Sequence, residues 1–135
     1  MTRRLLLALL ILAPALAFPS PRSIYDGYAT PAWILRGIAI EESGERDNAI
    51  GDDGISRGRM QLNRHYDAER RARWGAFDPF NPRDAIRIAD CILMDNLRAL
   101  GSWDLAIAAY RQGMAGVRRD GPCEWYVRRI KSAAR

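Results

Sequence analysis

Apolar residues recur every three or four positions in several stretches of the chain, and a glycine ends most of these stretches. Such spacing places apolar side chains on one face of a helix. Similar patterns cover residues 31–44, 63–75, 102–113 and a final segment after residue 122. The clearest stretch, residues 81–101, opens on Asn81-Pro82, and its stripe consists of Ile86, Ala89, Leu93, Leu97 and Leu100. The pattern predicts an all-α, mostly helical domain of about five helices.

The first predicted helix is followed by the segment AIGDDGISRGRMQ, residues 49–61, which cannot form a regular helix. Its glycines stand at positions 51, 54 and 58, and glycine is unfavourable inside a helix. We expect a turn-rich loop or a small hairpin here. At the start of the same helix, Thr30 followed by Pro31 predicts an N-cap and a first helical residue.

Two glutamates end the apolar run IAIEESG, residues 38–44. At about 100° per residue, Glu42 falls within the stripe formed by Leu35, Ile38 and Ala39, whereas Glu41 is turned toward its edge. Burial disfavours a charged carboxylate, and the negative end of the helix dipole acts in the same direction. Glu42 is therefore a candidate general acid with a raised pKa. The alternative is a glutamate that turns to solvent where the helix ends.

The first residues differ in kind from the rest. Arg3-Arg4 precede the apolar run LLLALLILAPALA, which closes on Ala15-Leu16-Ala17. This is the pattern of an export signal, and the run is shorter than the roughly 20 residues that span a bilayer. We expect a signal peptide over residues 1–17, a lead-in segment over 18–30 and a folded domain over 31–135. The domain is then periplasmic or secreted, without a stable membrane anchor.

The composition, 48% apolar and 27% charged, is that of a folded domain. Without Arg3 and Arg4 the formal charge falls from +5 to +3, which still favours an anionic polymer, but an export signal argues against nucleic acid. The basic stretch 69–73 is expected to be a solvated face.

An oxidising compartment permits one disulfide between Cys91 and Cys123, and two free thiols are the alternative. These cysteines and His65 lack the spacing of metal ligands, so no metal site is predicted.

Four stretches occur in a recognisable order: IAIEESG, GISRGRMQLN, NPRDAI and WDLAIAAYRQG. With them the chain resembles the lytic transglycosylase domain, a lysozyme-like fold related to goose-type lysozymes, over roughly residues 31–117. The chain departs from that family at Arg111-Gln112, where the family has Asn-Ala, and at Arg57 and Arg59, where small residues are usual. The resemblance implies that Glu42 is the catalytic acid and base. It also implies that the substrate-binding residues are Ser43, Ser56, Gly58, Met60, Gln61 and Tyr110.

The resemblance implies a reaction that needs one carboxyl group and no cofactor. Glu42 would protonate the glycosidic oxygen between N-acetylmuramic acid and N-acetylglucosamine, then accept a proton as a 1,6-anhydro ring closes. The partner is then the glycan strand of peptidoglycan, bound by a monomer. Two alternatives stay open: hydrolysis with Asp52 or Asp53 as a second carboxylate, and a non-catalytic peptidoglycan-binding module. Four tryptophans are expected in the core rather than as sugar platforms: Trp33, Trp74, Trp103 and Trp125.

Overall fold

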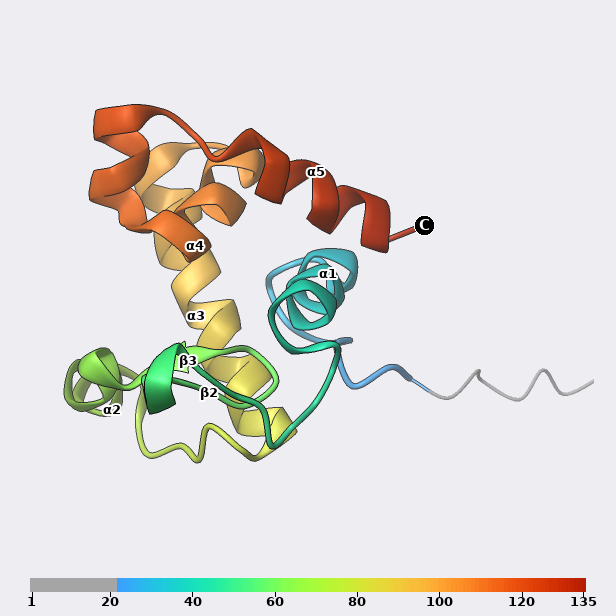
Figure 1. Cartoon of the computed structure of the whole chain (residues 1–135), viewed down its shortest axis with the longest axis vertical. Coiled ribbons are helices and arrows are strands. Elements are labelled where there is room, and N and C mark those ends of the chain that lie inside the picture. The colour runs from blue at the N-terminus through green and yellow to red at the C-terminus, as the bar shows by residue number, and fades with distance from the viewer. Residues whose placement is uncertain (1–21) are drawn as a thin grey trace, which may run out of the picture.

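The computed structural model describes residues 22–135. The expected signal peptide and the beginning of the lead-in segment lie outside the described residues. Within the described range the helices are α1 (Ala32–Ser43), α2 (Asp67–Trp74), α3 (Pro82–Leu100), α4 (Trp103–Asp120) and α5 (Glu124–Ala133) (Figure 1). The strands are β1 (Ile50–Gly51), β2 (Ser56–Arg57) and β3 (Leu62–Asn63). The predicted mostly helical fold with five helices and a small hairpin region is confirmed.

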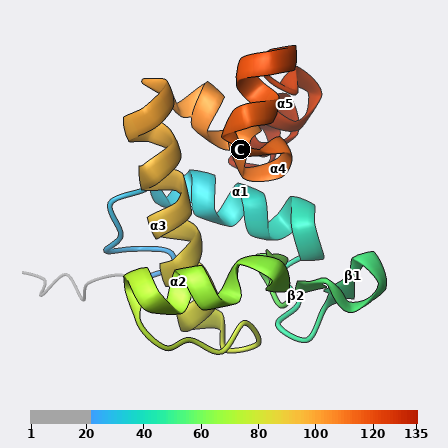
Figure 2. The ribbon, with the colours of Figure 1, turned by 90° about the vertical axis from the view of Figure 1, so that its left-hand side faces the viewer.

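The α3 helix follows its sequence signals closely. The Asn81 side chain accepts hydrogen bonds from the backbone N–H groups of Arg83 and Asp84, Pro82 occupies the first helical position, and Gly101 ends the helix. These contacts satisfy backbone groups that the helix itself leaves unpaired. The predicted stripe faces the core, where Ile86, Ala89 and Leu93 are fully buried. The long α3 packs mainly against α4 (Figures 1 and 2).

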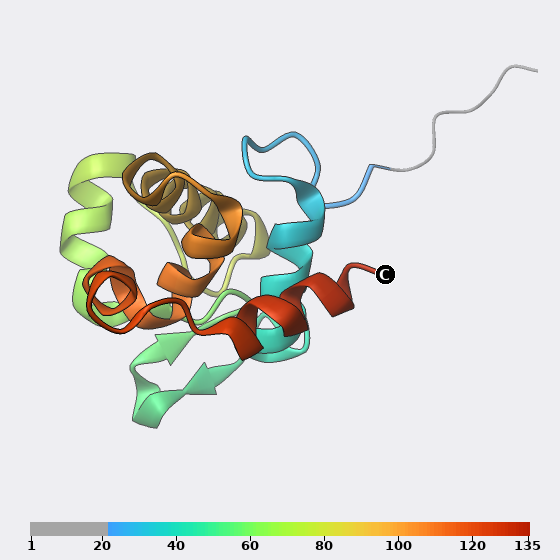
Figure 3. The same cartoon turned by 90° about the horizontal axis from the view of Figure 1, so that it is seen from above.

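The α1 helix is the element that carries the candidate general acid. Four residues of its predicted stripe are fully buried: Ile34, Leu35, Ile38 and Ala39. Gly44 ends the helix with a left-handed φ of 62°. At Gly37 a side chain would collide with Ile130 of α5, since an added Cβ would lie 2.8 Å from its carbonyl oxygen. This close approach lets α5 lie alongside α1 (Figures 1 and 3).

The predicted cap at Thr30 is wrong. The helix starts from the Pro31 carbonyl, which accepts from the N–H groups of Ile34 and Leu35, and no side chain caps it. Thr30 is buried instead, and its backbone N–H donates to the Asp90 side chain of α3 at 2.8 Å. The Thr30 hydroxyl is buried and forms no hydrogen bond with the described residues.

The glycine-rich segment forms a three-stranded antiparallel sheet in the order β1-β2-β3. Ile50 pairs with Arg57, and Ser56 pairs with Asn63. This small sheet lies beyond the C-terminal end of α1 (Figures 2 and 3). It is anchored to the core by Met60 and Leu62, which are almost completely buried. The sheet therefore has a fixed position relative to the last turn of α1.

Neither Cys91 nor Cys123 forms a disulfide in the structure. Cys91 lies on α3, where the charges of Asp90 and Arg87 act on its thiol. Cys123 precedes α5, and its backbone N–H donates to the Gln112 side chain of α4 at 2.6 Å. The two residues are held by different neighbours, so the free-thiol alternative describes this structure.

The expectation that all four tryptophans are in the core is wrong for two of them. Trp33 is 38% exposed and Trp125 is 41% exposed, whereas Trp74 and Trp103 pack against the core as partly buried residues. Helical phase explains the exposure of Trp33, since it is one position before the stripe that starts at Ile34. Trp125 likewise precedes the fully buried Tyr126.

Candidate active site

A groove with a volume of about 880 Å³ lies beside the last turn of α1. Its walls come from α1, the sheet region and helices α2, α3 and α4, so residues far apart in the sequence share one cavity. The predicted site residues Glu42, Ser56, Gln61 and Tyr110 all line it. The unusual glycine-rich segment thus leaves an open groove beside the candidate acid.

Glu42 is half-buried at the groove and holds a raised pKa. Burial is the main cause, because it penalises the charged form, and the negative charges of Glu41 and Asp52 add to it. Two groups act in the opposite direction: the hydroxyl of Tyr126, which donates to Oε1 of Glu42 at 2.5 Å, and the positive charge of Arg111. The carboxyl can therefore both hold a proton and be stabilised once it has lost it.

The neighbouring Glu41 faces a different part of the surface. It does not line the groove, and its carboxylate forms an ion pair with Nε of Arg129 on α5 at 3.1 Å. The rotation of about 100° between consecutive helical residues accounts for the separation of the two carboxylates. Helical phase thus identified which of the two glutamates enters the groove.

Tyr126 is a site residue that the sequence reasoning missed. The sequence indicated it only as an apolar position of the last helix, 84 residues away from Glu42. It is fully buried, and its pKa is raised by that burial and by the nearby Glu42 carboxylate. The hydroxyl therefore keeps its proton and acts as a donor. No local spacing could have found this pair, because only the packing of α5 on α1 creates it.

Tyr110 lines the groove from α4, but its hydroxyl is engaged. It donates to the backbone carbonyl of Met60 at 2.7 Å and so ties α4 to the loop before β3. Burial raises the pKa of Tyr110, and the Glu42 charge adds to the shift, so this hydroxyl also stays protonated. Met60 itself is buried beneath the groove and does not line it.

Gln61 reaches the groove through an uncommon backbone conformation. Its φ of 49° lies in the left-handed region, which few residues other than glycine adopt. Its side-chain amide donates to the carbonyl of Gly58 at 3.0 Å, which fixes its direction. Gly58 also has a positive φ of 74°, and an added Cβ there would lie 1.8 Å from the Pro79 carbonyl oxygen. Gly58 is thus required for close backbone packing rather than as a groove-lining residue.

Ser43 and Ser56, both predicted to bind substrate, lie in different surroundings. Ser43 is buried outside the groove, where its hydroxyl donates to the Arg59 carbonyl at 2.8 Å and accepts from the Arg46 N–H at 3.1 Å. It joins the end of α1 to the loop. Ser56 lines the groove, and its hydroxyl donates to the Asp52 carboxylate at 2.5 Å.

Arg59, one of the departures noted in the sequence, holds this loop in place. Its guanidinium donates to Asp47 at 2.7 Å and to the hydroxyl of Tyr25 at 2.8 Å. Tyr25 in turn donates to Glu45 at 2.7 Å, and burial is the largest cause that raises its pKa to about 12. The described part of the lead-in segment therefore packs against the domain and braces the loop beside Ser43.

The basic stretch over residues 69–73 is only partly a solvated face. Arg70 and Arg73 of α2 line the groove, and Arg73 forms an ion pair with Asp95 of α3 at 2.6 Å. Arg70 donates to the Asn63 carbonyl at 2.9 Å. The groove therefore carries both signs of charge along its length, which the local sequence did not indicate.

Residues 22–135 contain no cluster of three or more histidine, cysteine or acidic side chains placed to hold a metal ion. In the same range, no helix is both long enough and apolar enough to cross a membrane. The side chains that line the groove include carboxyl, hydroxyl, amide and guanidinium groups.

Residues 22–122 match the family model described as the Transglycosylase SLT domain. Neither the curated proteins nor the solved structures gave a match to this chain. The family match includes Glu42, the sheet and the groove-lining part of α4, and it ends just before α5. The match covers most of the chain and agrees with the lysozyme-like arrangement of helices. This chain belongs to the transglycosylase SLT domain family, whose activity is broadly the cleavage of peptidoglycan.

Proposed function

We propose that this domain is an exported lytic transglycosylase that cleaves the β-1,4 bond between N-acetylmuramic acid and N-acetylglucosamine. The observation that carries the proposal is the state of Glu42: half-buried at an open groove, with a raised pKa and a hydroxyl donor on one oxygen. Export rests on the apolar run that ends at Ala15-Leu16-Ala17. The substrate is the glycan strand of peptidoglycan, and the reaction requires no cofactor.

In this mechanism Glu42 acts twice. As an acid it gives its proton to the glycosidic oxygen, so that the bond to the anomeric carbon breaks and the N-acetylglucosamine side leaves as an alcohol. As a carboxylate it then takes the proton from the muramoyl 6-hydroxyl, whose oxygen closes on the anomeric carbon as the 1,6-anhydro ring. No water is consumed, and Glu42 ends protonated as it began. A carboxyl with a raised pKa suits both steps.

The ionised form of Glu42 exists only between the two proton transfers. The Tyr126 hydrogen bond and the Arg111 charge both favour that form, so they support the second step. Gln61 and Ser56 offer polar groups along the groove for the substrate's hydroxyl and acetamido groups. Tyr110 is proposed to shape the groove wall by holding the Met60 backbone.

Mass spectrometry of the fragments released from purified peptidoglycan tests this proposal. We expect disaccharide-peptides that are lighter by one water than hydrolytic products, because the anhydro ring replaces a reducing end. Fragments with reducing ends would contradict the transglycosylase outcome. The absence of any fragments would favour a non-catalytic peptidoglycan-binding module.

The Glu42→Gln variant should lose turnover, because the amide can neither donate nor recover the proton, while the folded structure persists. Glu41→Gln is the matched control on the adjacent residue and should retain most activity, since Glu41 does not line the groove. Rates of anhydro-product formation and thermal unfolding should be measured for both. Equal loss of activity in the two variants would contradict the assignment of Glu42.

Hydrolysis is a second candidate outcome because Asp52 lines the same groove and its charge raises the pKa of Glu42. A hydrolase often uses a second carboxylate to activate water. Asp53 does not line the groove, so Asp52 is the better placed of the two aspartates for this role. If Asp52 directs water, Asp52→Asn should remove reducing-end products. If the proposed mechanism holds, that variant should still release anhydro products.

A further inference from the structure

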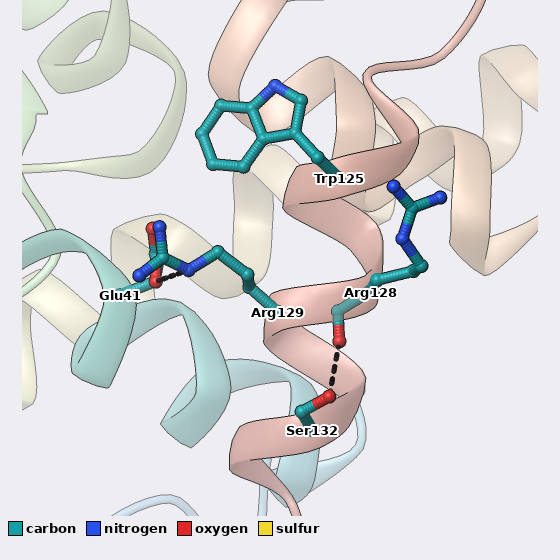
Figure 4. Close-up of a pocket in the computed structure, with 5 residues that line it drawn as sticks. All are labelled: Glu41, Trp125, Arg128, Arg129 and Ser132. Carbon is teal, nitrogen blue, oxygen red and sulfur yellow. Dashed lines mark hydrogen bonds and ion pairs between the residues drawn. The ribbon is translucent and has the colours of Figure 1, made fainter.

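A second hollow lies between the last turn of α1 and α5, outside the catalytic groove. Its volume is about 610 Å³, and none of its lining residues lines the groove. Figure 4 shows the Arg129 side chain reaching from α5 to Glu41 of α1, with Trp125 on the same side of α5 and the Arg128 guanidinium on the other side. The lining residues are Glu41, Trp125, Arg128, Arg129 and Ser132.

Trp125 provides the hollow with an exposed but ordered aromatic surface. The indole is 41% exposed, yet it is held by two contacts. The Arg111 guanidinium lies over its ring at 4.8 Å from the centroid, and the Tyr126 ring meets it edge-on at 5.8 Å. An indole that is fixed before a ligand arrives loses little conformational freedom on binding.

A charged pair stands beside the indole. The Glu41 carboxylate and the Arg129 guanidinium form an ion pair at 3.1 Å, with their side chains 20% and 64% exposed (Figure 4). Such a pair can accept and donate hydrogen bonds to the hydroxyl and acetamido groups of a sugar. An aromatic ring can at the same time cover the apolar face of a pyranose.

Two features connect the residues of the hollow with those of the catalytic groove. Glu41 and Glu42 are consecutive, and each lines one of the two spaces. Arg111 lines the groove and also stacks on Trp125, which lines the hollow. A linear polymer bound beside Glu42 can therefore pass over Arg111 and reach Trp125.

We propose that the surface formed by Trp125, Arg129 and Glu41 is a second sugar-binding subsite, which holds the peptidoglycan strand where it continues beyond the cleaved bond. The inference rests on the proposed function, since it assumes that the strand occupies the groove. The subsite adds affinity for long strands without taking part in proton transfer. A short fragment that occupies only the groove does not reach it.

Binding without turnover tests the subsite. The Glu42→Gln protein is mixed with insoluble peptidoglycan, and the bound fraction is measured by sedimentation over a concentration series. Adding Trp125→Ala should weaken binding about tenfold, the effect of losing a stacked aromatic contact with its ordered surroundings. The matched control is Trp33→Ala, which removes a similarly exposed tryptophan that lines neither space. With Trp33→Ala added, the Glu42→Gln protein should bind peptidoglycan as strongly as it does without this substitution.

A second variant distinguishes the loss of a sugar contact from a folding defect caused by Trp125→Ala. Arg129→Ala removes an exposed side chain of the same hollow and should also weaken binding, while Arg118→Ala on α4 should not. Unchanged binding by both Trp125→Ala and Arg129→Ala would overturn the subsite. A Glu42→Gln protein that does not sediment with peptidoglycan at all would overturn the proposed function, and the subsite with it.

The active enzyme gives an independent readout. With long glycan strands, Trp125→Ala should raise KM about tenfold. Any change in kcat should be the same for long and short substrates, because Trp125 also contacts Arg111 and Tyr126 beside Glu42. With the shortest fragments that are still cleaved, KM should be unaffected. An equal rise in KM for long and short substrates would contradict a subsite beyond the groove and overturn the proposal.

Discussion

The protonation of Glu42 is set by residues from several elements rather than by its own helix alone. Burial at the groove raises its pKa, and the nearby Asp52 adds to the rise. Tyr126 from α5 and Arg111 from α4 favour the ionised form. The balance matters because the proposed reaction needs the acid first and the carboxylate second. Substitutions at Tyr126 or Arg111 therefore affect chemistry without removing the acid.

Tyr126→Phe is expected to raise the pKa of Glu42 further. The lost hydroxyl stabilises the carboxylate, so without it the protonated form persists to higher pH. Activity needs a protonated Glu42, so it falls as pH rises through this pKa, and the alkaline limb of the pH–rate profile should move to higher pH. We also expect kcat to fall about tenfold, the typical effect of losing a hydrogen bond to a charged group.

The measurement is kcat and kcat/KM for release of anhydro products across the pH range, with a thermal unfolding control. Tyr110→Phe is the matched comparison, because its hydroxyl donates to the Met60 carbonyl and not to Glu42. Its alkaline limb should move much less. An unchanged limb in Tyr126→Phe would show that the hydroxyl does not influence the ionisation of Glu42.

At the scale of elements, the segment between α1 and β3 is the part of the fold that shapes the groove. It is fixed from three sides: the Ser43 hydroxyl contacts the Arg59 carbonyl, the Tyr110 hydroxyl contacts the Met60 carbonyl, and Gly58 packs on Pro79. These contacts involve α1, α4 and the segment before α3. A short sheet alone is marginally stable, so these external contacts determine its position.

Gly58→Ala is expected to destabilise the domain by about 3 kcal/mol or more, because the new methyl group would overlap the Pro79 carbonyl at a positive φ. Gly54→Ala is the control. Gly54 also has a positive φ of 88°, but an added Cβ there meets nothing within 4 Å, so only about 1 kcal/mol of backbone strain is expected. Urea denaturation measures both values. Similar decreases in the free energy of unfolding of the two variants would argue against the close approach between Gly58 and the Pro79 carbonyl.

At the scale of the whole molecule, the packing of α5 against α1 completes the site. Gly37 permits the contact with Ile130, and the same packing brings Tyr126 to Glu42. It also places Trp125 and Arg129 beside Glu41. The family match ends at residue 122, so the helix that completes the environment of Glu42 lies beyond it.

The whole fold leaves Cys91 and Cys123 without a disulfide. We expect both Cys91 and Cys123 to be free, because each is held by different neighbours. Labelling with a thiol reagent in denaturant, without reductant, should modify both residues. In the native protein Cys91 should react slowly, since burial raises the pKa of its thiol and the thiolate is the reactive form. Protection of both residues until a reductant is added would reveal a disulfide and contradict the structure.

Much of the fold was predictable from the sequence because its signals are local. Asn81-Pro82 and Gly101 set the ends of α3, and periodic apolar residues gave the buried faces of the helices. The same periodicity distinguished Glu42 from Glu41. The cap at Thr30 and the core positions of Trp33 and Trp125 were predicted wrongly. These residues lie at the end of a helix or at the edge of its buried face, where the packing of neighbouring helices decides whether a side chain is buried.

The sequence by itself determined the helices, the glycine-rich interruption and the carboxyl group that enters the groove, since each depends on neighbours within a few positions. Only the tertiary structure decided what surrounds that carboxyl. Tyr126 lies 84 residues from Glu42 in the sequence. Ser43 connects the end of α1 to the loop through its hydrogen bond to the Arg59 carbonyl and does not line the groove. A carboxyl pKa depends on burial and on charges in space, and these are fixed only when separate helices pack together.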